Sequence, residues 1–531
     1  MTSTFLATSV LGFSGPGDVP TKPNVLYLMA DDMRPQLGCY GHTSMSTPNL
    51  DKLAAGGLTF EQAYTQFAYC APSRNSFMSG RRPERTRALN FDTDFRKQHG
   101  DSWVTMPQHF KLSGYFTSAA GKLYHDGMDD PASWSYPSNQ TAWIQCQEGD
   151  FVDPLGNYCG ITNKSKIQYT DEDLALAEGL KRLDVAHASG KPWFVGIGVH
   201  RPHHSSRVPE GWWGSQAYPG EIAPPKHPLA PVGAPYMSGN WLAGDYRDPA
   251  HGCPNCSVPA VRSVEYRRWY YAATSYADMM LGKALDKLEQ LGDGVAARTI
   301  TVFHADHGYQ LGELNEWSKK TDTELATRVP LIIRVPWKPR AAGAKTAVNA
   351  ELVDMYRTLA ELSGLADGVQ DDVQGTSLAP LFDQPSLLPS AAAGPSAADS
   401  DAAAAAALAV KPAFSQIGSC ACEEHTKDGW TGLECGAGRC IHTPVSQFDF
   451  MGYTMRTADG WRLTAWVPMN ANTSRVDWSR RVYDELYDLR GAAAAGNSFD
   501  FDGMSVNVAG GHPKLVSQLR AQLREAVDSW Y

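Results

Sequence analysis

The sequence lacks any apolar run of about 18 residues or more, and this absence predicts that no helix spans a membrane. It also lacks a basic run long enough to neutralise a phosphate backbone, and its formal net charge is -10. General nucleic-acid or polyanion binding is therefore excluded, and any anionic substrate must meet a local cluster of positive groups. No internal repeat is visible, so nothing indicates a repeat architecture.

The length and composition are those of a large globular protein. The chain has 531 residues, of which 43% are apolar, with 15 Trp and 22 Tyr. These values exclude a mainly disordered or fibrous chain. The length predicts one large domain with a smaller companion, or about two to four ordinary domains.

Ten cysteines bear on the cellular compartment. Cys146 and Cys159 lie in one polar stretch, and we predict that they form a disulfide. We expect at least one more bridge within residues 420–440. Zinc is the alternative, because CxxC and CxC pairs can bind metal, but no His-x-His partner completes a tetrahedral set. The closely spaced cysteines to which these two alternatives apply are Cys253, Cys256, Cys420, Cys422, Cys435 and Cys440.

Two further features agree with a secretory route. Residues 4–15, TFLATSVLGFSG, resemble the apolar part of a signal peptide, although the usual leading Lys or Arg is missing. We interpret residues 1–22 as a signal or leader segment, with a truncated leader as the alternative, and expect a lysosomal or extracellular protein. Sequons for N-glycosylation stand at Asn139, Asn163, Asn255 and Asn472.

The pattern of apolar residues predicts an α/β fold. Continuous apolar runs predict buried strands, which we read as parallel at residues 24–30 and 298–305. Apolar residues at helical spacing predict helices between the strands. Alternating strands and helices indicate a sheet covered on both faces. The remaining predicted elements are strands at 192–199 and 328–336 and helices at 171–188 and 275–292.

The composition changes after residue 386. Residues 387–411 are rich in Ala and Ser and predict a flexible linker or insertion, with a helix over the Ala run as the alternative. Beyond them, residues 453–467 alternate around an Asp-Gly turn and predict a β-hairpin. We therefore expect a main domain over residues 23–386 and a smaller C-terminal subdomain with an antiparallel sheet over residues 412–531.

Acidic residues follow two of the predicted strands. Asp31 and Asp32 come directly after one strand, and Asp306 and His307 come after another. Since the carboxyl ends of the strands form the ligand crevice of an open α/β sheet, these groups could converge there. Such an oxygen-rich set suits Ca²⁺ or Mg²⁺. The alternative for each pair is an ordinary turn or helix-cap role.

Cys70 stands where a helix is expected to start, because a Pro and a Ser follow it. A thiol at the positive end of a helix dipole is expected to be reactive. The alternative is a buried or disulfide-linked cysteine. A thiolate is a soft ligand and fits poorly among hard oxygen ligands, a conflict that disappears if the sulfur is replaced by oxygen.

The segment 70–83, CAPSRNSFMSGRRP, resembles the signature of the sulfatase family, in which the cysteine of C-x-P-S-R is oxidised to Cα-formylglycine. The resemblance implies an alkaline-phosphatase-like fold, a mixed sheet sandwiched by helices, and a sulfuric ester hydrolase acting on sulfated carbohydrate. Several segments look most like the iduronate-2-sulfatase branch. Further segments in the family's order are NVLYLMADDMRPQLGCYG, GKLYHDG, HRPHH, DHGYQLGELNEWSKK and ELYDL.

The resemblance also implies a metal site and a maturation step. One calcium ion would be bound by the oxidised side chain of Cys70 together with Asp31, Asp32, Asp306 and His307. A formylglycine-generating enzyme is implied as the partner that oxidises Cys70.

The resemblance assigns the remaining polar residues to substrate chemistry. Arg74 would hold the formylglycine hydrate, and Lys122 and Lys319 would contact the sulfate ester together with two histidines. We expect His125 to be the base in sulfate elimination and His203 to be the acid that protonates the leaving alcohol. The rival functions are a phosphomonoesterase or phosphonate hydrolase on the same scaffold and a non-catalytic glycan-binding protein.

Overall fold

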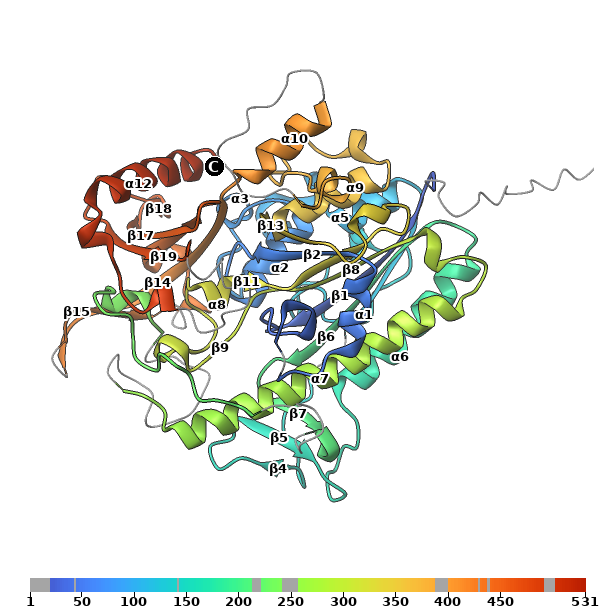
Figure 1. The fold of residues 1–531 in the computed structure, drawn as a ribbon, viewed down its shortest axis with the longest axis horizontal. Helices are drawn as coiled ribbons and strands as arrows, with labels where there is room; N and C mark the ends of the chain where they lie inside the picture. Colours follow the sequence, from blue (N-terminus) through green and yellow to red (C-terminus); the bar gives the residue numbers. More distant parts are fainter. Residues whose placement is uncertain are drawn as a thin grey trace, which may run out of the picture.

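The structure, a computed structural model, describes residues 20–531 except 43, 141–142, 213–220, 241–255, 387–399, 428–429, 437–439 and 491–501. A central sheet lies between two layers of helices, and a second sheet with the last helix lies beside them (Figure 1). The mixed α/β fold with a C-terminal antiparallel sheet is therefore confirmed. Among the described residues, no helix is long and apolar enough to cross a membrane.

The central sheet has the strand order β11-β2-β12-β8-β1-β6-β3, with β13 paired to β2. Strand β1 pairs in parallel with both β6 and β8, and all side chains of these three strands are buried. The strands predicted from continuous apolar runs are thus confirmed. The bounds are β1 (Asn24–Asp31), β2 (Leu58–Tyr64), β3 (Phe116–Gly121), β6 (Trp193–Pro202), β8 (Thr299–Ala305), β11 (Arg328–Val329), β12 (Leu331–Arg334) and β13 (Lys345–Glu351).

The strand predicted at residues 328–336 departs from the parallel arrangement. It divides at Pro330, which has no N–H to donate, into β11 and β12. Strand β12 runs antiparallel to both β8 and β2. The connection from β8 contains only short elements and no crossover helix, so the chain returns in the opposite direction.

Helices cover both faces of the central sheet (Figure 1). Helix α6 has the predicted bounds, since a capping box at Thr170 starts it. Helix α7 begins 15 residues before the predicted start at residue 275. Its residues 260–262 are exposed and residues 269–278 are all buried, so this part shows no single apolar face. The bounds are α1 (Pro48–Ala55), α2 (Cys70–Ser79), α3 (Pro83–Thr86), α4 (Phe95–His99), α5 (Met106–Leu112), α6 (Asp171–Ala188), α7 (Ala260–Gln290), α8 (Glu324–Thr327) and α9 (Met355–Leu362).

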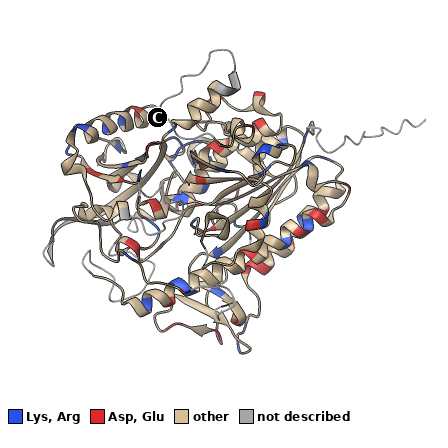
Figure 2. Ribbon diagram, viewed as in Figure 1, with Lys and Arg blue, Asp and Glu red and all other residues tan. Residues whose placement is uncertain are grey.

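Both acidic and basic residues occur along the outer helices α6 and α7 (Figure 2). Short strands outside the central sheet form small sheets of their own. They are β4 (Phe151–Val152), β5 (Tyr158–Ile161), β7 (Ser206–Pro209), β9 (Gln310–Leu311) and β10 (Trp317–Ser318).

The C-terminal sheet is antiparallel, and helix α12 packs against it. The predicted hairpin is confirmed by the pairing of β16 with β17, in which Tyr453 lies opposite Ala465. Phe67 and Tyr69, just before Cys70, pack in the core of this sheet, which therefore supports the start of α2. The bounds are β14 (Ala413–Lys427), β15 (Trp430–Gly436), β16 (Phe448–Arg456), β17 (Trp461–Asn470), β18 (Arg475–Val476), β19 (Tyr483–Asp488) and α12 (Pro513–Asp528).

The Ala-rich stretch is partly described. Residues 387–399 lie outside the described residues, whereas Ser400–Ala409 form helix α10. Ala405 and Leu408 are buried, and the helix contacts β13. Over these residues the flexible-linker prediction is wrong and the helical alternative holds. A short Ala helix is marginal in water, so contact with the main domain supplies the stability that its sequence lacks.

Two disulfides support the prediction that the cysteines form disulfide bonds, with zinc binding as the alternative. Cys146 is bonded to Cys159, and Cys420 to Cys440, as predicted. Closing the first, 13-residue loop contributes about 3 kcal/mol in the chain-entropy model. Cys256 is also disulfide-bonded, but Cys253 lies outside the described residues.

A cavity of about 20 Å³, room for one water molecule, lies between the central-sheet part of the chain and the C-terminal sheet. Three buried acids line it. Burial raises the pKa of Glu485 to about 7, and hydrogen bonds with Tyr487 and Trp466 offset this only in part. Burial raises the pKa of Asp322 to about 6, and Arg462 offsets this only in part. Burial also raises the pKa of Glu316 well above its ordinary range.

Because the pKa values of these acids are raised in the folded state, we expect the protein to lose stability as the pH rises. Below the ordinary pKa of 4.5, Glu485 is protonated in both the folded and the unfolded state; between that value and about 7, only the folded state holds the proton. The stabilisation is therefore fully present at acidic pH and lost as the pH passes about 7. Urea unfolding from pH 4.5 to pH 8 measures this.

Glu485→Gln should remove part of the slope. Between pH 4.5 and pH 8, the unfolding free energy of the variant should rise by on the order of 1–3 kcal/mol relative to that of wild type. Glu525→Gln, on the exposed side of α12, is the matched control and should follow the wild-type curve. Parallel curves for Glu485→Gln and wild type would contradict the assignment.

Candidate active site

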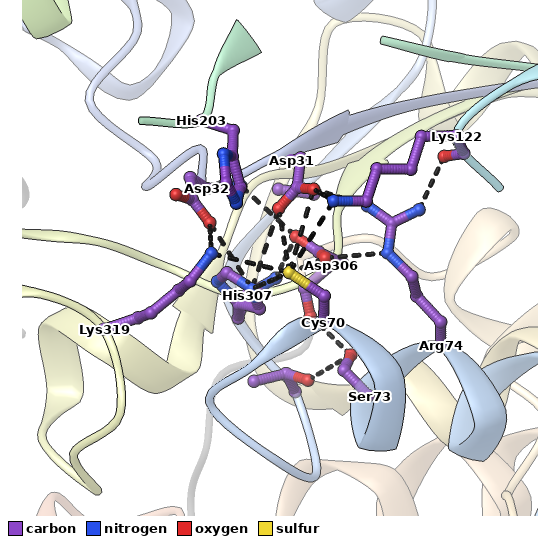
Figure 3. Close-up of polar contacts among 12 residues, drawn as sticks. Asp31, Asp32, Cys70, Ser73, Arg74, Lys122, His203, Asp306, His307 and Lys319 are labelled. Atoms are coloured by element: carbon purple, nitrogen blue, oxygen red, sulfur yellow. Dashed lines mark hydrogen bonds and ion pairs between the residues drawn. The ribbon is translucent and has the colours of Figure 1, made fainter. Parts of the chain in front are cut away.

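The two predicted acidic pairs meet at the carboxyl ends of β1 and β8, and the start of α2 brings Cys70 to them (Figure 3). The Cys70 Sγ atom lies 3.4 Å from Asp31 Oδ1 and 3.4 Å from His307 Nε2. His307 Nε2 is 3.5 Å from Asp32 Oδ1 and 3.4 Å from Asp306 Oδ2. All five side chains are buried, so the structure brings the predicted metal-binding residues into one cluster.

Three cationic side chains surround this cluster. Arg74 Nε is 2.9 Å from Asp306 Oδ2, and Lys122 Nζ is 2.5 Å from Asp31 Oδ2. Lys319 Nζ lies 2.5 Å from Asp32 Oδ1 and 3.4 Å from Cys70 Sγ. Helix α2 supplies both Cys70 and Arg74, which lie one turn apart on the same helix face. A negatively charged group beside Cys70 would therefore meet fixed positive charge.

The two aspartates of the Asp31-Asp32 pair differ in their electrostatics. Burial raises the pKa of Asp31, but Lys122, His203 and Arg74 outweigh burial and hold that pKa well below its ordinary range. Burial raises the pKa of Asp32 well above its ordinary range, because Lys319 offsets burial only in part. Asp32 Oδ2 is buried and has no hydrogen-bond partner among the described residues.

The donor set fits a hard divalent cation. Three carboxylates and the His307 imidazole lie around Cys70 (Figure 3), and one oxygen of Asp32 has no hydrogen-bond partner among the described residues. A divalent cation would give Asp32 the positive charge that Lys319 alone does not supply. The residues that could hold it fall into two overlapping groups, in each of which the possible ligand atoms lie within 4.8 Å of one another. These groups are Asp31, Cys70, Asp306 and His307, and Asp31, Asp32, Cys70 and His203.

His203 comes to the cluster from the turn after β6. The possible ligand atoms of His203, Asp31, Asp32 and Cys70 all lie within 4.8 Å of one another. The N–H of His203 donates to the carbonyl oxygen of His200 over 2.8 Å. Its ring packs edge-on against Trp143, with 4.9 Å between ring centroids.

A buried carboxylate that the sequence analysis missed holds this turn. Glu172 Oε1 accepts hydrogen bonds from the backbone N–H groups of His200 and Arg201, over 3.1 and 2.8 Å. Asp171, its neighbour, lies 2.9 Å from the Arg201 guanidinium. In the sequence these acids are ordinary first-turn residues of a helix, so only the pairing of α6 with the turn after β6 identifies them.

His125 lies beside the cluster rather than in it. Its ring stacks on Phe91, with 4.5 Å between centroids, and its Nδ1 is buried without a hydrogen-bond partner among the described residues. Burial, together with Lys122 and Arg74, lowers the pKa of His125 to about 3. The imidazole is therefore neutral at pH 7.

At the carboxyl edge of a mixed sheet, these carboxylates, the histidine and the helix-start cysteine lie beside fixed positive charges, an arrangement suited to binding an anionic ester. The chain belongs to the sulfatase family, because the Sulfatase family model matches residues 23–365. It is accordingly a sulfuric ester hydrolase.

Relatives in this family include iduronate 2-sulfatases. The Homo sapiens protein is 34% identical over 388 residues, 64% of this chain and 69% of that protein, and the Mus musculus protein is 33% identical over 387 residues, with the same coverage. The choline-sulfatase of Rhizobium meliloti is 29% identical over 390 residues, 68% of this chain and 71% of that protein.

Solved structures share the fold. One, in complex with its substrate D-glucosamine-2-N,6-O-disulfate, has a TM-score of 0.66 at 19% identity and covers 96% of this chain and 98% of its own. The phosphonate monoester hydrolase of Agrobacterium radiobacter has a TM-score of 0.65 at 18% identity and covers 96% of both chains. At such identities these likenesses establish the alkaline-phosphatase-like fold alone.

Proposed function

We propose that this protein hydrolyses a sulfate monoester of a sulfated sugar, using a formylglycine made from Cys70 and a bound calcium ion. The observation that carries the proposal is the position of Cys70, 3.4 Å from both Asp31 and His307 and 3.4 Å from the Lys319 ammonium. A sulfur atom is a poor ligand in this oxygen-rich group, whereas a hydrated aldehyde offers oxygen in the same place.

The aldehyde also explains how a covalent intermediate is released. One hydroxyl of the hydrated residue 70 attacks sulfur, and the S–O bond to the sugar oxygen breaks. The second hydroxyl then loses its proton, the carbon–oxygen bond to sulfate breaks, and the aldehyde re-forms. Addition of one water molecule to the aldehyde restores the hydrate and completes the hydrolysis. Serine or cysteine could form the covalent ester but has no second hydroxyl for this exit.

The cationic side chains stabilise the negative charge of the sulfate. Lys122 and Lys319 would contact the sulfate oxygens, and Arg74 would orient the hydrate from its place on α2. Their partners fix these groups before substrate binds, so little reorganisation is needed when charge develops. Asp31, Asp32, Asp306 and His307 would hold the calcium ion, which would supply further positive charge to the site.

The two histidines would transfer protons on opposite sides of sulfur. His125 is neutral and is proposed to take the proton of the second hydroxyl. Burial and Lys319 keep the pKa of His203 well below its ordinary range in the free protein. The negative charge of a bound sulfate ester would favour protonation of His203, which is proposed to donate that proton to the leaving sugar oxygen.

The proposed substrate class is a sulfated uronic acid sugar, as in the iduronate 2-sulfatase relatives. We also propose that residues 23–386 form the catalytic domain and residues 412–531 a subdomain. A formylglycine-generating enzyme would mature Cys70.

A secretory route, to a lysosome or to the exterior, is proposed for the mature protein. Disulfides such as Cys146–Cys159 persist in oxidising compartments. The sequon residues Asn139, Asn163 and Asn472 are exposed, so they are accessible to glycosylation; Asn255 lies outside the described residues.

The competing function is hydrolysis of a phosphonate or phosphate monoester, because phosphonate monoester hydrolases share the fold. Matured protein should be assayed with sulfated mono- and disaccharides, including iduronate 2-sulfate, and with aryl phosphate and phosphonate monoesters. We expect the highest kcat/KM with a sulfated uronic acid. A preference for the phosphorus esters would overturn the proposal.

A further inference from the structure

Asp32 has an unusual backbone conformation for a residue that would bind a metal. Its φ is +62°, in the left-handed region that a residue with a side chain rarely adopts. Asp adopts this region more readily than most residues with a side chain, but the conformation still costs free energy and persists where surrounding groups hold it. The conformation matters because it sets the direction of the carboxylate beside Asp31.

A single tyrosine hydroxyl bridges the two sides of this turn. The hydroxyl of Tyr270 donates to the Asp32 carbonyl oxygen over 2.8 Å and accepts from the Arg34 N–H over 3.0 Å. On the other side, the Asp32 N–H donates to Asp306 Oδ1 over 3.2 Å. Asp32 is thus held at its carbonyl by helix α7 and at its N–H by a second carboxylate of the cluster.

Tyr270 also packs against the segment that follows β8, which carries Asp306 and His307. It is buried, and its ring stacks on Tyr309, with 5.1 Å between centroids and 12° between planes. Tyr309 follows Asp306 and His307 in the chain by only a few residues. Tyr270 therefore contacts both segments that carry the carboxylates, although it contributes no ligand and takes no part in the proposed chemistry.

We propose that Tyr270 is a positioning residue that presets Asp32 for cation binding and so raises the calcium affinity of the site. The inference rests on the proposed function, in which Asp32 is a calcium ligand. Without the hydroxyl, Asp32 can relax from the left-handed conformation, and the cation must restore it on binding. That restoration lowers affinity.

The test compares Tyr270→Phe with Tyr271→Phe. Tyr271 is also buried, and its hydroxyl accepts a hydrogen bond from Gln36 Nε2 over 2.6 Å, so its variant loses a comparable contact from the same helix. Calcium is titrated into each metal-free protein by calorimetry. We expect Tyr270→Phe to weaken calcium binding about tenfold, as an unsatisfied buried polar group commonly does, and Tyr271→Phe to stay within about twofold of wild type.

The outcomes separate the inference from the function on which it rests. If the wild-type protein binds no calcium, the proposed calcium site is wrong. If the wild-type protein binds calcium and Tyr270→Phe binds it equally well, only the positioning role of Tyr270 is wrong. Should Tyr270→Phe not fold, Tyr309→Leu removes the stacking partner and is expected to weaken binding by about threefold or more; unchanged affinity in that variant overturns the role.

Discussion

The Cys70→Ser variant is expected to stop after one covalent sulfation of residue 70. The serine hydroxyl can attack sulfur, but it has no second hydroxyl with which to expel sulfate. Turnover should fall by about 10⁴- to 10⁶-fold, as when the nucleophile of another covalent hydrolase is removed. Intact-mass spectrometry after mixing with a sulfate ester should find the mass of one added SO₃ group.

Cys70→Ala is the matched control, since it lacks any nucleophile and should remain unmodified. Peptide mass spectrometry of the wild-type segment ending at Arg74 should show that sulfur has been lost from residue 70. Fully active wild-type protein that contains only unmodified cysteine would rule out the formylglycine mechanism, as would steady turnover by Cys70→Ser at the wild-type rate.

The second large effect separates metal binding from proton transfer. Asp306→Ala removes a carboxylate that pairs with Arg74 at 2.9 Å and accepts from the backbone N–H groups of Asp32 and His307. Bound calcium and activity should both be lost, because one change disrupts the ligand set and the residues that orient it. Metal analysis after gel filtration measures the first, and a sulfate-ester assay the second.

His125→Ala should behave differently, because His125 lies outside the group of possible metal ligands. Calcium content should stay at the wild-type value while turnover falls by about 10²- to 10⁴-fold, the usual range for a general acid or base. The sulfate ester on residue 70 should accumulate. His442→Ala is the control, since that imidazole packs on the same Phe91 ring, with 6.0 Å between centroids.

Two results would remove His125 from the mechanism. One is turnover of His125→Ala at the wild-type rate. The other is loss of calcium to the extent expected for Asp306→Ala, which would make His125 part of the metal site.

Much of the site could be predicted because it depends on local patterns. Asp31 and Asp306 follow continuous apolar runs, and parallel strands place their carboxyl ends at one edge of a sheet. The start of α2 at Cys70 agrees with the Pro and Ser that follow it. Glu172 and Tyr270 could not be found in this way, because each acts on a segment far from it in the chain.

Local sequence patterns were enough to predict the family, the buried strands β1 and β8, helix α6 and most of the candidate site residues. The direction of β12, the packing of α10, the place of His203 and the contact of Tyr270 with Asp32 became known from the fold. Periodicity and capping report the burial of neighbouring residues. Strand direction and long-range hydrogen bonds depend on how distant segments pack, and local patterns do not record that packing.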